Sequence, residues 1–147
     1  MRAVIQRVGS ASVKIDNRKV SGIKEGMVVL LGISAVDTQR DIDMMVDKIR
    51  NLRIFPDNEG KMNIPIRDMG GEILVVSQFT LLADLENGRR PSFTEAAPPQ
   101  KAQDIYNQVV EKLKIEGLKV ETGKFQESMQ VELINDGPVT LIFDTRK

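Results

Sequence analysis

The chain has 147 residues, 41% of them hydrophobic and 29% charged, which is the size and composition of one soluble globular domain and excludes a disordered chain. It has no cysteine, histidine or tryptophan, so disulfides, thiol nucleophiles, thiolate zinc sites and Ser-His-Asp triads are excluded, and we expect no metal and no other cofactor. Lysine and arginine (21) balance aspartate and glutamate (21), and aromatic residues are few, so any contact with nucleic acid should be local, for example to one end of a strand, rather than a long wrapped or stacked complex.

The first part of the sequence is expected to form β-structure. Arg2–Val8 and Ala11–Ile15 are β-rich runs split by Gly9-Ser10, a pattern that predicts a hairpin. After a short segment at Val20–Ile23, the continuous apolar run Met27–Leu31 is expected to be a central strand.

The same region bears on the location of the protein. The chain starts without an apolar stretch of the signal-peptide kind. Its longest apolar run, Met27–Ile33, is far too short to cross a bilayer. We therefore expect a cytoplasmic protein with no membrane partner.

The middle of the sequence changes its period. Apolar residues follow helical spacing over Ile42–Leu52, and Asp37 or Thr38 is the expected N-cap. Strands are predicted at Leu52–Phe55 and, after a pair of glycines, at Glu72–Val76.

The last third begins with an irregular stretch, Leu85–Pro99, and loops this long in compact domains are often functional. A second helix is expected from the apolar face between Ala102 and Leu113, with Gly117 ending it. Three further strands are predicted after it, at Leu118–Glu121, Met129–Ile134 and Val139–Phe143. The order of elements predicts an α+β domain over residues 1–147, with a mostly antiparallel sheet and two main helices.

Polar side chains follow directly on the strand predicted at Glu72–Val76. In Ser77-Gln78-Phe79-Thr80, two hydroxyls and an amide stand where an apolar strand ends and the chain has to turn. A hydroxyl there can orient a substrate while neighbouring N–H groups, freed from the strand ladder, form an oxyanion hole. The alternative is a polar strand end whose hydroxyls cap the following turn. The pattern by itself leaves both open.

Asn135-Asp136-Gly137-Pro138 has the composition of a hairpin turn, with Pro138 at the first residue of the next strand. Its unusual feature is a glycine directly before proline in a tight connection, since X-Pro bonds are the only ones that become cis at modest cost. The pattern by itself favours the ordinary turn.

Two charged groups are ambiguous in the same way. Asp43 and Asp47 lie one helical turn apart on a polar face, which indicates a solvated surface rather than a metal pair. On the long loop, Arg89 and Arg90 are either solvated surface or, as two neighbouring guanidiniums, a bidentate contact to phosphate.

Taken together, Ser77–Leu81 and Asn135–Thr140 resemble the two signature motifs of the D-aminoacyl-tRNA deacylase family. The resemblance spans the whole chain and includes the segments Met1–Val8, Lys61–Asn63, Gly71–Val76, Arg90–Phe93 and Thr122–Phe125. After Phe125 the family usually has a glycine and a small residue. This chain has Gln126, Glu127 and Ser128 there, so the shape of the pocket near Met129 is expected to differ.

The resemblance implies that the protein hydrolyses the ester between a D-amino acid and the 3′-terminal ribose of tRNA and spares L-aminoacyl-tRNA, which is chiral proofreading in translation. It also implies a single α+β domain with a curved, barrel-like sheet. The family acts as a homodimer on the aminoacylated CCA end of tRNA, and we expect no DNA partner. Balanced charge is compatible with this substrate, because only a short single strand has to enter the pocket.

Residue roles are carried over from the family onto matching positions. Ser77, Phe79 and Thr80 are the expected catalytic residues. The expected substrate-binding residues are Gln78, Ala102 and Met129. Gly137 and Pro138 of the other subunit, joined by a cis bond, form the expected chiral gate, and Arg89 and Arg90 are candidate phosphate contacts. Such a gate excludes side chains, so glycine, which has none, should pass.

The absence of histidine bears on the mechanism, because the chain has no imidazole base to activate Ser77 or Thr80 as a nucleophile. We favour attack by water assisted by the ribose 2′-hydroxyl, with Thr80 as nucleophile the alternative. Two other classes of function stay open on the sequence: a non-catalytic module that binds RNA ends, and an esterase or amidase for small molecules.

Overall fold

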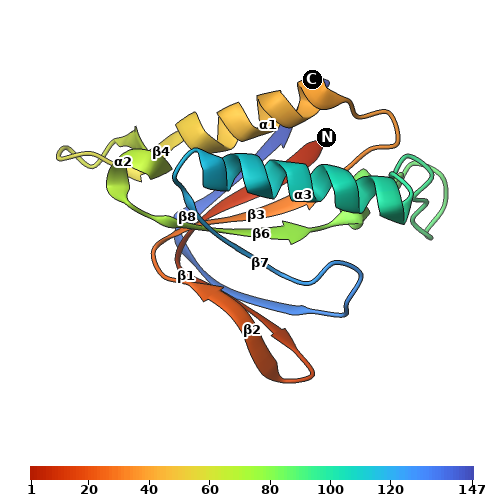
Figure 1. Ribbon diagram of the computed structural model, residues 1–147, viewed down its shortest axis with the longest axis horizontal. Coiled ribbons are helices and arrows are strands. Elements are labelled where there is room, and N and C mark those ends of the chain that lie inside the picture. Colours follow the sequence, from red (N-terminus) through yellow and green to blue (C-terminus); the bar gives the residue numbers. More distant parts are fainter.

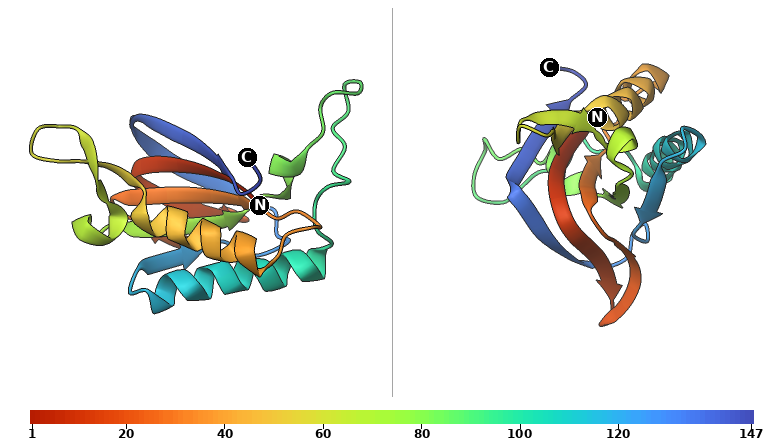
Figure 2. Two further views of the ribbon diagram at one scale, coloured as in Figure 1. Left: turned by 90° about the horizontal axis from the view of Figure 1, so that it is seen from above. Right: turned by 90° about the vertical axis from the view of Figure 1, so that its left-hand side faces the viewer.

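The computed structural model describes all 147 residues and has two long helices lying side by side on one face of a curved sheet (Figures 1 and 2). The elements follow in this order: β1 (Arg2–Ile15), β2 (Arg18–Ile23), β3 (Gly26–Gly32), α1 (Gln39–Asn51), β4 (Arg53–Pro56), β5 (Met62–Pro65), α2 (Ile66–Met69), β6 (Glu72–Ser77), the 3-10 helix η1 (Phe79–Leu82), α3 (Pro99–Ile115), β7 (Lys119–Thr122) and β8 (Gln130–Asp144). Both main helices are confirmed, and Thr38 is the N-cap of α1. The short elements β5, α2 and η1 were not predicted.

The sheet has the strand order β2-β1-β3-β6-β7, with β8 paired to β1. β1 is antiparallel to β2, β3 and β8, whereas β3–β6 and β6–β7 are parallel. The α+β class and the barrel-like curvature are confirmed, but the sheet is mixed rather than mostly antiparallel. The reason is that the connections carrying α1 and α3 each join parallel neighbours, which need a long crossover.

β1 corrects the first prediction, because no hairpin forms at Gly9-Ser10. The strand continues from Arg2 to Ile15 and pairs with β8 along its length. Its register with β8 shifts around Val8, and there the strand passes from pairing with β3 to pairing with β2. The break in the apolar pattern at Gly9-Ser10 is therefore an irregularity within one continuous strand. The pairing of β1 with β8 shifts its register there, and the chain does not reverse.

β8 corrects the second prediction in the same way. Asn135 stands opposite Val8 and Thr140 stands opposite Gln6, so both halves of β8 run antiparallel to β1. The segment Asp136–Val139 bulges outward instead of reversing the chain. The interpretation of Asn135–Pro138 as a hairpin turn is wrong, and Gly137 and Pro138 lie exposed at the tip of this bulge.

Both faces of the central strands are buried. On β3, Met27 and Val29 face a core shared with α1 and α3, and Val28 faces a second core inside the curve of the sheet. Ile73 and Leu74 divide in the same way on β6. Burial on both faces explains why these strands read as continuous apolar runs instead of alternating ones.

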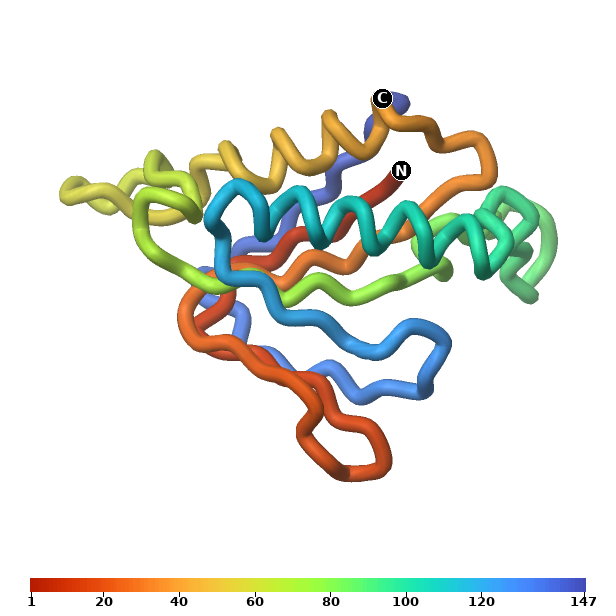
Figure 3. The backbone as a smooth tube through the Cα atoms, viewed as in Figure 1, coloured from red at the N-terminus to blue at the C-terminus, as the bar shows by residue number.

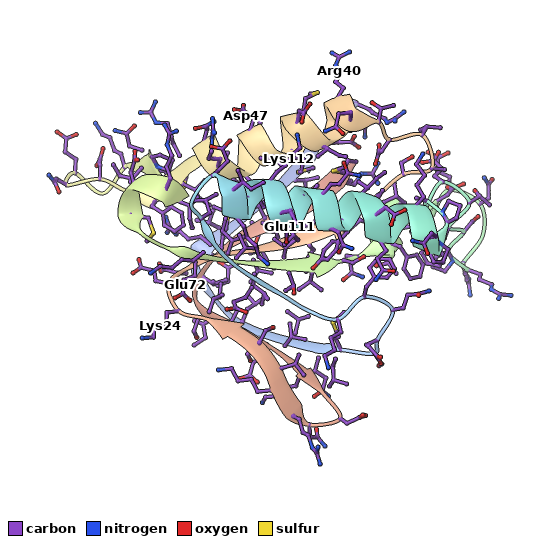
Figure 4. All side chains as sticks on the ribbon, viewed as in Figure 1. Lys24, Arg40, Asp47, Glu72, Glu111 and Lys112 are labelled. Atoms are coloured by element: carbon purple, nitrogen blue, oxygen red, sulfur yellow. The ribbon has the colours of Figure 1, made fainter.

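The outer faces of the helices are charged, as predicted for Asp43 and Asp47. Lys112 of α3 lies 2.7 Å from the Asp43 carboxylate of α1, and Figure 4 shows further charged side chains, Arg40 and Asp47 among them, along the same surface. None of the helices is both long and apolar enough to cross a membrane.

The two ends of the chain lie close together (Figure 3). The Met1 nitrogen donates to a carboxylate oxygen of Asp37 over 2.7 Å, and the Thr145 N–H donates to the Met1 carbonyl over 3.0 Å. These bonds fix the start of β1 beside the end of β8, next to the segment that follows β3.

Candidate functional site

A cavity of about 590 Å³ opens where β6 ends and the two cores meet. Five residues singled out in the sequence line it together: Ser77, Gln78, Phe79, Ala102 and Met129. The sequence placed Gln126, Glu127 and Ser128 beside the pocket near Met129 without giving them a role, and all three line the cavity. It did not assign the lining residues Ile33, Phe93 and Phe125 to the site, although the long loop Leu85–Pro99 was a signal for Phe93.

The chain turns at Gln78 because the sheet ends there. The Gln78 N–H donates to the Leu31 carbonyl of β3 over 2.8 Å, and the next bonds are those of η1, with Leu81 N–H donating to the Gln78 carbonyl over 3.2 Å. The N–H groups of Phe79 and Thr80 thus stand in the first turn of a helix, where an N–H has no acceptor within the helix. These two N–H groups directly follow the end of β6, and their role as oxyanion donors stays a prediction.

η1 is held in place from β3 and from β1. A Cβ on Gly32 would lie 2.4 Å from Leu82 Cδ2 and 3.0 Å from the Gln78 carbonyl oxygen, so only glycine lets η1 come this close to β3. The Arg2 guanidinium donates to the Leu81 carbonyl over 2.6 Å and to the Asp144 carboxylate over 3.1 Å.

The pair formed by Arg2 and Asp144 is ionised. Burial would raise the pKa of Asp144, but hydrogen bonds from the Arg146 backbone and from Arg2, with the charge of Arg2, hold that pKa below its ordinary value. A charged pair therefore ties η1 to the end of β8.

Few groups in the cavity can carry a proton. Glu127 is the one residue of its lining with a carboxylate, and the lining has no cationic side chain. Beside the lining residue Phe125, the Tyr106 hydroxyl donates to the Val75 carbonyl over 2.7 Å, and burial raises the pKa of Tyr106, so this hydroxyl stays protonated. Nowhere in the chain do three His, Cys, Asp or Glu side chains come together as a metal site would require.

Thr80 lies at the edge of this arrangement. It is exposed and is not part of the cavity lining. Its hydroxyl accepts a hydrogen bond from the Gln78 side-chain amide. Arg89 and Arg90 also lie outside the cavity, exposed on the loop that projects beyond η1 (Figure 2, left).

The bulge of β8 is not part of the cavity, because neither Gly137 nor Pro138 lines it. The bond between them is cis. Asn135 closes the bulge: its side-chain oxygen accepts from the Val139 N–H over 2.7 Å. The Arg7 guanidinium donates to the Asp136 carbonyl over 2.9 Å and to the Ile54 carbonyl over 2.7 Å, so the bulge is fixed to the body of the domain.

The chain is similar to known proteins along nearly its whole length, and the family model and the relatives point to the same family. Residues 4–144 match the family described as D-Tyr-tRNA(Tyr) deacylase. The chain is 52% identical to the D-aminoacyl-tRNA deacylase of Thermotoga petrophila and 55% identical to that of Kosmotoga olearia, in each case over 147 residues that cover 100% of this chain and 99% of the relative. The D-aminoacyl-tRNA deacylase of Dictyoglomus turgidum is 56% identical over 145 residues, covering 99% of this chain and 93% of the relative.

Two solved structures share the fold. The c-Myc DNA unwinding element binding protein has a TM-score of 0.93 at 44% identity, with 99% of both chains covered. A probable eukaryotic D-amino acid tRNA deacylase has a TM-score of 0.82 at 16% identity, with 97% of both chains covered. The second likeness, at such low identity, is one of fold.

Proposed function

The chain belongs to the D-aminoacyl-tRNA deacylase family and is a hydrolase of D-aminoacyl-tRNA, and we propose that the reaction takes place in the cavity at the end of β6. The observation that carries this assignment is that Ser77, Gln78 and Phe79 line one cavity with Ala102 and Met129, although these residues come from distant parts of the chain. Because its substrate is aminoacyl-tRNA, the protein acts in the cytoplasm, where translation takes place.

The reaction is ester hydrolysis. Water attacks the carbonyl carbon, the bond from that carbon to the ribose 3′-oxygen breaks, and this oxygen leaves with a proton, which gives a D-amino acid and tRNA with a free 3′-hydroxyl. The developing oxyanion accepts hydrogen bonds from the N–H groups of Phe79 and Thr80, which have no acceptor within η1. One good donor of this kind contributes about 3 kcal/mol to lowering the barrier. Ser77 orients the substrate beside them.

The position of η1 makes a first prediction. Gly32→Ala places a methyl group against Leu82 and the Gln78 carbonyl, so η1 has to move away from β3. Its N–H groups then no longer point at the oxyanion of the transition state. We expect kcat/KM for D-aminoacyl-tRNA to fall by about tenfold or more, since a misplacement of about 1 Å can cost 100-fold. Gly9→Ala is the matched control, because a Cβ there meets nothing within 4 Å. Equal rates for both variants, measured on folded protein, would contradict the role given to η1.

A hydroxyl of the substrate, and not a side chain of the protein, assists proton transfer. No histidine exists in the chain, and the Thr80 hydroxyl is engaged by the Gln78 amide and has no base beside it. The Glu127 carboxylate belongs to the cavity wall, whereas the vicinal 2′-hydroxyl of the terminal ribose is adjacent to the ester within the substrate itself. Attack by water assisted by this hydroxyl is therefore favoured over a covalent intermediate on Thr80.

We further propose that the protein is a homodimer and that the bulge of each subunit enters the partner's cavity. Three observations support this. Gly137 and Pro138 are exposed and do not line the cavity of their own subunit. β8 pairs with β1 alone, which leaves a long strand edge free. Ile134 and Ile142 on β8 are 65% and 74% exposed, an apolar surface that a second copy would cover.

The dimer makes a second prediction. Ile142→Glu puts a charge into the proposed interface, and we expect a monomer in light scattering and loss of most of the deacylase activity. Ile115→Glu, at a position 82% exposed on α3 and away from β8, should stay dimeric and active. A fully active Ile142→Glu monomer would contradict the shared site.

The gate explains chirality. When two substrates differ by one methylene, a soft apolar pocket discriminates between them by only about 1–3 kcal/mol of transition-state binding. This is too little to reject L-aminoacyl-tRNA. A rigid backbone wall at Gly137 and Pro138, held by Arg7 and Asn135, rejects a side chain that projects towards it. A wall of this kind lets glycine pass, so glycyl-tRNA should be hydrolysed as well.

One assay tests the function: release of amino acid from matched D-tyrosyl-tRNA, L-tyrosyl-tRNA and glycyl-tRNA. We expect hydrolysis of the first and third and not of the second. Binding of tRNA ends without release would favour a non-catalytic module. Equal turnover of free D-tyrosine esters would favour a small-molecule esterase. The balanced charge gives no support to duplex DNA as a partner, whatever the name of the similar structure.

A further inference from the structure

The aromatic side chains of this protein are concentrated at the cavity. The chain has only five phenylalanines and one tyrosine. Phe79, Phe93 and Phe125 all line the cavity, and the Tyr106 ring lies 6.1 Å from that of Phe125. The composition suggested too few aromatic residues to stack a run of bases; the fold gathers most of them at one place instead.

Two of these rings face solvent at the mouth. Phe79 is 54% exposed and Phe93 is 36% exposed, whereas Phe55 in the core is 1% exposed. The rings of Phe79 and Phe93 touch edge to face, with centroids 5.1 Å apart and planes at 72°. We call this pair the aromatic shelf. An exposed apolar pair beside a cavity is a surface suited to a flat ligand.

The shelf is fixed in place by the backbone. Asp84 and Ser92 exchange two backbone hydrogen bonds, of 2.7 and 3.1 Å, which close the loop between η1 and Phe93 into a hairpin. The Ala35 N–H donates to the Glu95 carbonyl over 3.0 Å on the other side of Phe93. Phe93 therefore stands against Phe79 in a defined position.

The tip of the same hairpin is basic. Arg89 and Arg90 are exposed, and neither forms an ion pair with a carboxylate of the chain. This hairpin therefore carries unpaired guanidiniums at its tip and leads directly to the exposed Phe93 ring. Proteins hold a single nucleic-acid strand with the same two kinds of group, because cations contact phosphates and rings stack with bases.

We propose that the aromatic shelf binds the nucleobase directly before the terminal adenosine of the substrate, by stacking. This rests on the proposed function. The aminoacylated adenosine occupies the cavity, so the preceding nucleotide has to leave through the mouth, where Phe79 and Phe93 are exposed. Its base stacks on the shelf, and the phosphates further towards the 5′ end of the strand run towards Arg89 and Arg90. Because every base has a π-face, the shelf reads the presence of a base and not its identity.

A double-mutant cycle between protein and RNA tests the shelf. D-tyrosyl-tRNA is prepared with its normal penultimate nucleotide and with an abasic one, and kcat/KM is measured for the unmodified protein and for Phe93→Leu. Removing the base should slow the unmodified protein by about fivefold or more, the low end of what one stacked base contributes. The same removal should cost Phe93→Leu much less, so that the two changes are coupled. Phe93→Tyr, which keeps a ring, should behave like the unmodified protein.

Phe143→Leu is the matched control, because the Phe143 ring lies under Lys48 and does not line the cavity. A double-mutant cycle of Phe143→Leu with base removal should show no coupling. Additive effects of Phe93→Leu and base removal would overturn the shelf while leaving the deacylase intact. Failure of the unmodified protein to hydrolyse the unmodified substrate would instead overturn the proposed function.

Discussion

A tRNA that ends in 2′-deoxyadenosine and is charged with a D-amino acid on its 3′-hydroxyl should be hydrolysed about 100-fold more slowly than normal D-aminoacyl-tRNA. The size follows from general acid–base assistance, which typically contributes 100-fold or more. The protein has no histidine to replace it, and the buried Tyr106 hydroxyl keeps its proton. The measurement is single-turnover release of the amino acid with enzyme in excess, so that binding differences do not mask the chemical step.

Two variants separate the 2′-hydroxyl from groups of the protein. Thr80→Ala should cost less than the deoxy substitution, because its hydroxyl only accepts from the Gln78 amide. Glu127→Gln removes the one carboxylate of the cavity lining and should also cost less. Normal hydrolysis of the deoxy substrate, together with a dead Thr80→Ala or an acyl group trapped on Thr80, would assign the step to a nucleophilic threonine. A dead Glu127→Gln would assign it to a carboxylate base.

Gly137→Ala should lower kcat/KM for D-aminoacyl-tRNA by about 100-fold in a protein that still folds and dimerises. Gly137 has φ +144°, which residues with a side chain rarely adopt, and an added Cβ would lie 2.8 Å from Val139 Cγ2 and 2.9 Å from the Val139 nitrogen. It would also lie 3.2 Å from the Arg7 guanidinium that fixes the bulge. The bulge has to shift, and a gate displaced by about 1 Å loses productive geometry at this scale.

The control for this variant is Gly9→Ala, on the strand next to the bulge, where a Cβ meets nothing within 4 Å. Light scattering and thermal unfolding of both variants show whether the dimer and the fold survive. If Gly137→Ala keeps its rate and its preference for D- over L-substrates while folded, the bulge is not the gate.

Much of this protein was readable from its sequence. The helical spacing around Met45 and around Val109 predicts α1 and α3, and both residues are fully buried. The change from apolar to polar residues at Ser77 marks the end of β6, next to the cavity. Such features are set by a few consecutive residues, whose periodicity records which side of an element is buried.

Features that depend on pairing between distant segments were decided only by the fold. Gly9 and Gly137 both stand in turn-like sequences, yet both lie within long strands, because β1 and β8 pair with each other on either side of the irregular positions. A turn and a bulge use the same residue types, so composition does not separate them. Likewise Phe93 and Phe125 belong to segments that resemble the family, but their meeting at the mouth and wall of one cavity depends on β7, β8 and the segment after η1. The sequence by itself determined which residues the chemistry has available, and the tertiary structure decided which of them meet, since cavity walls are built from contacts that local periodicity does not record.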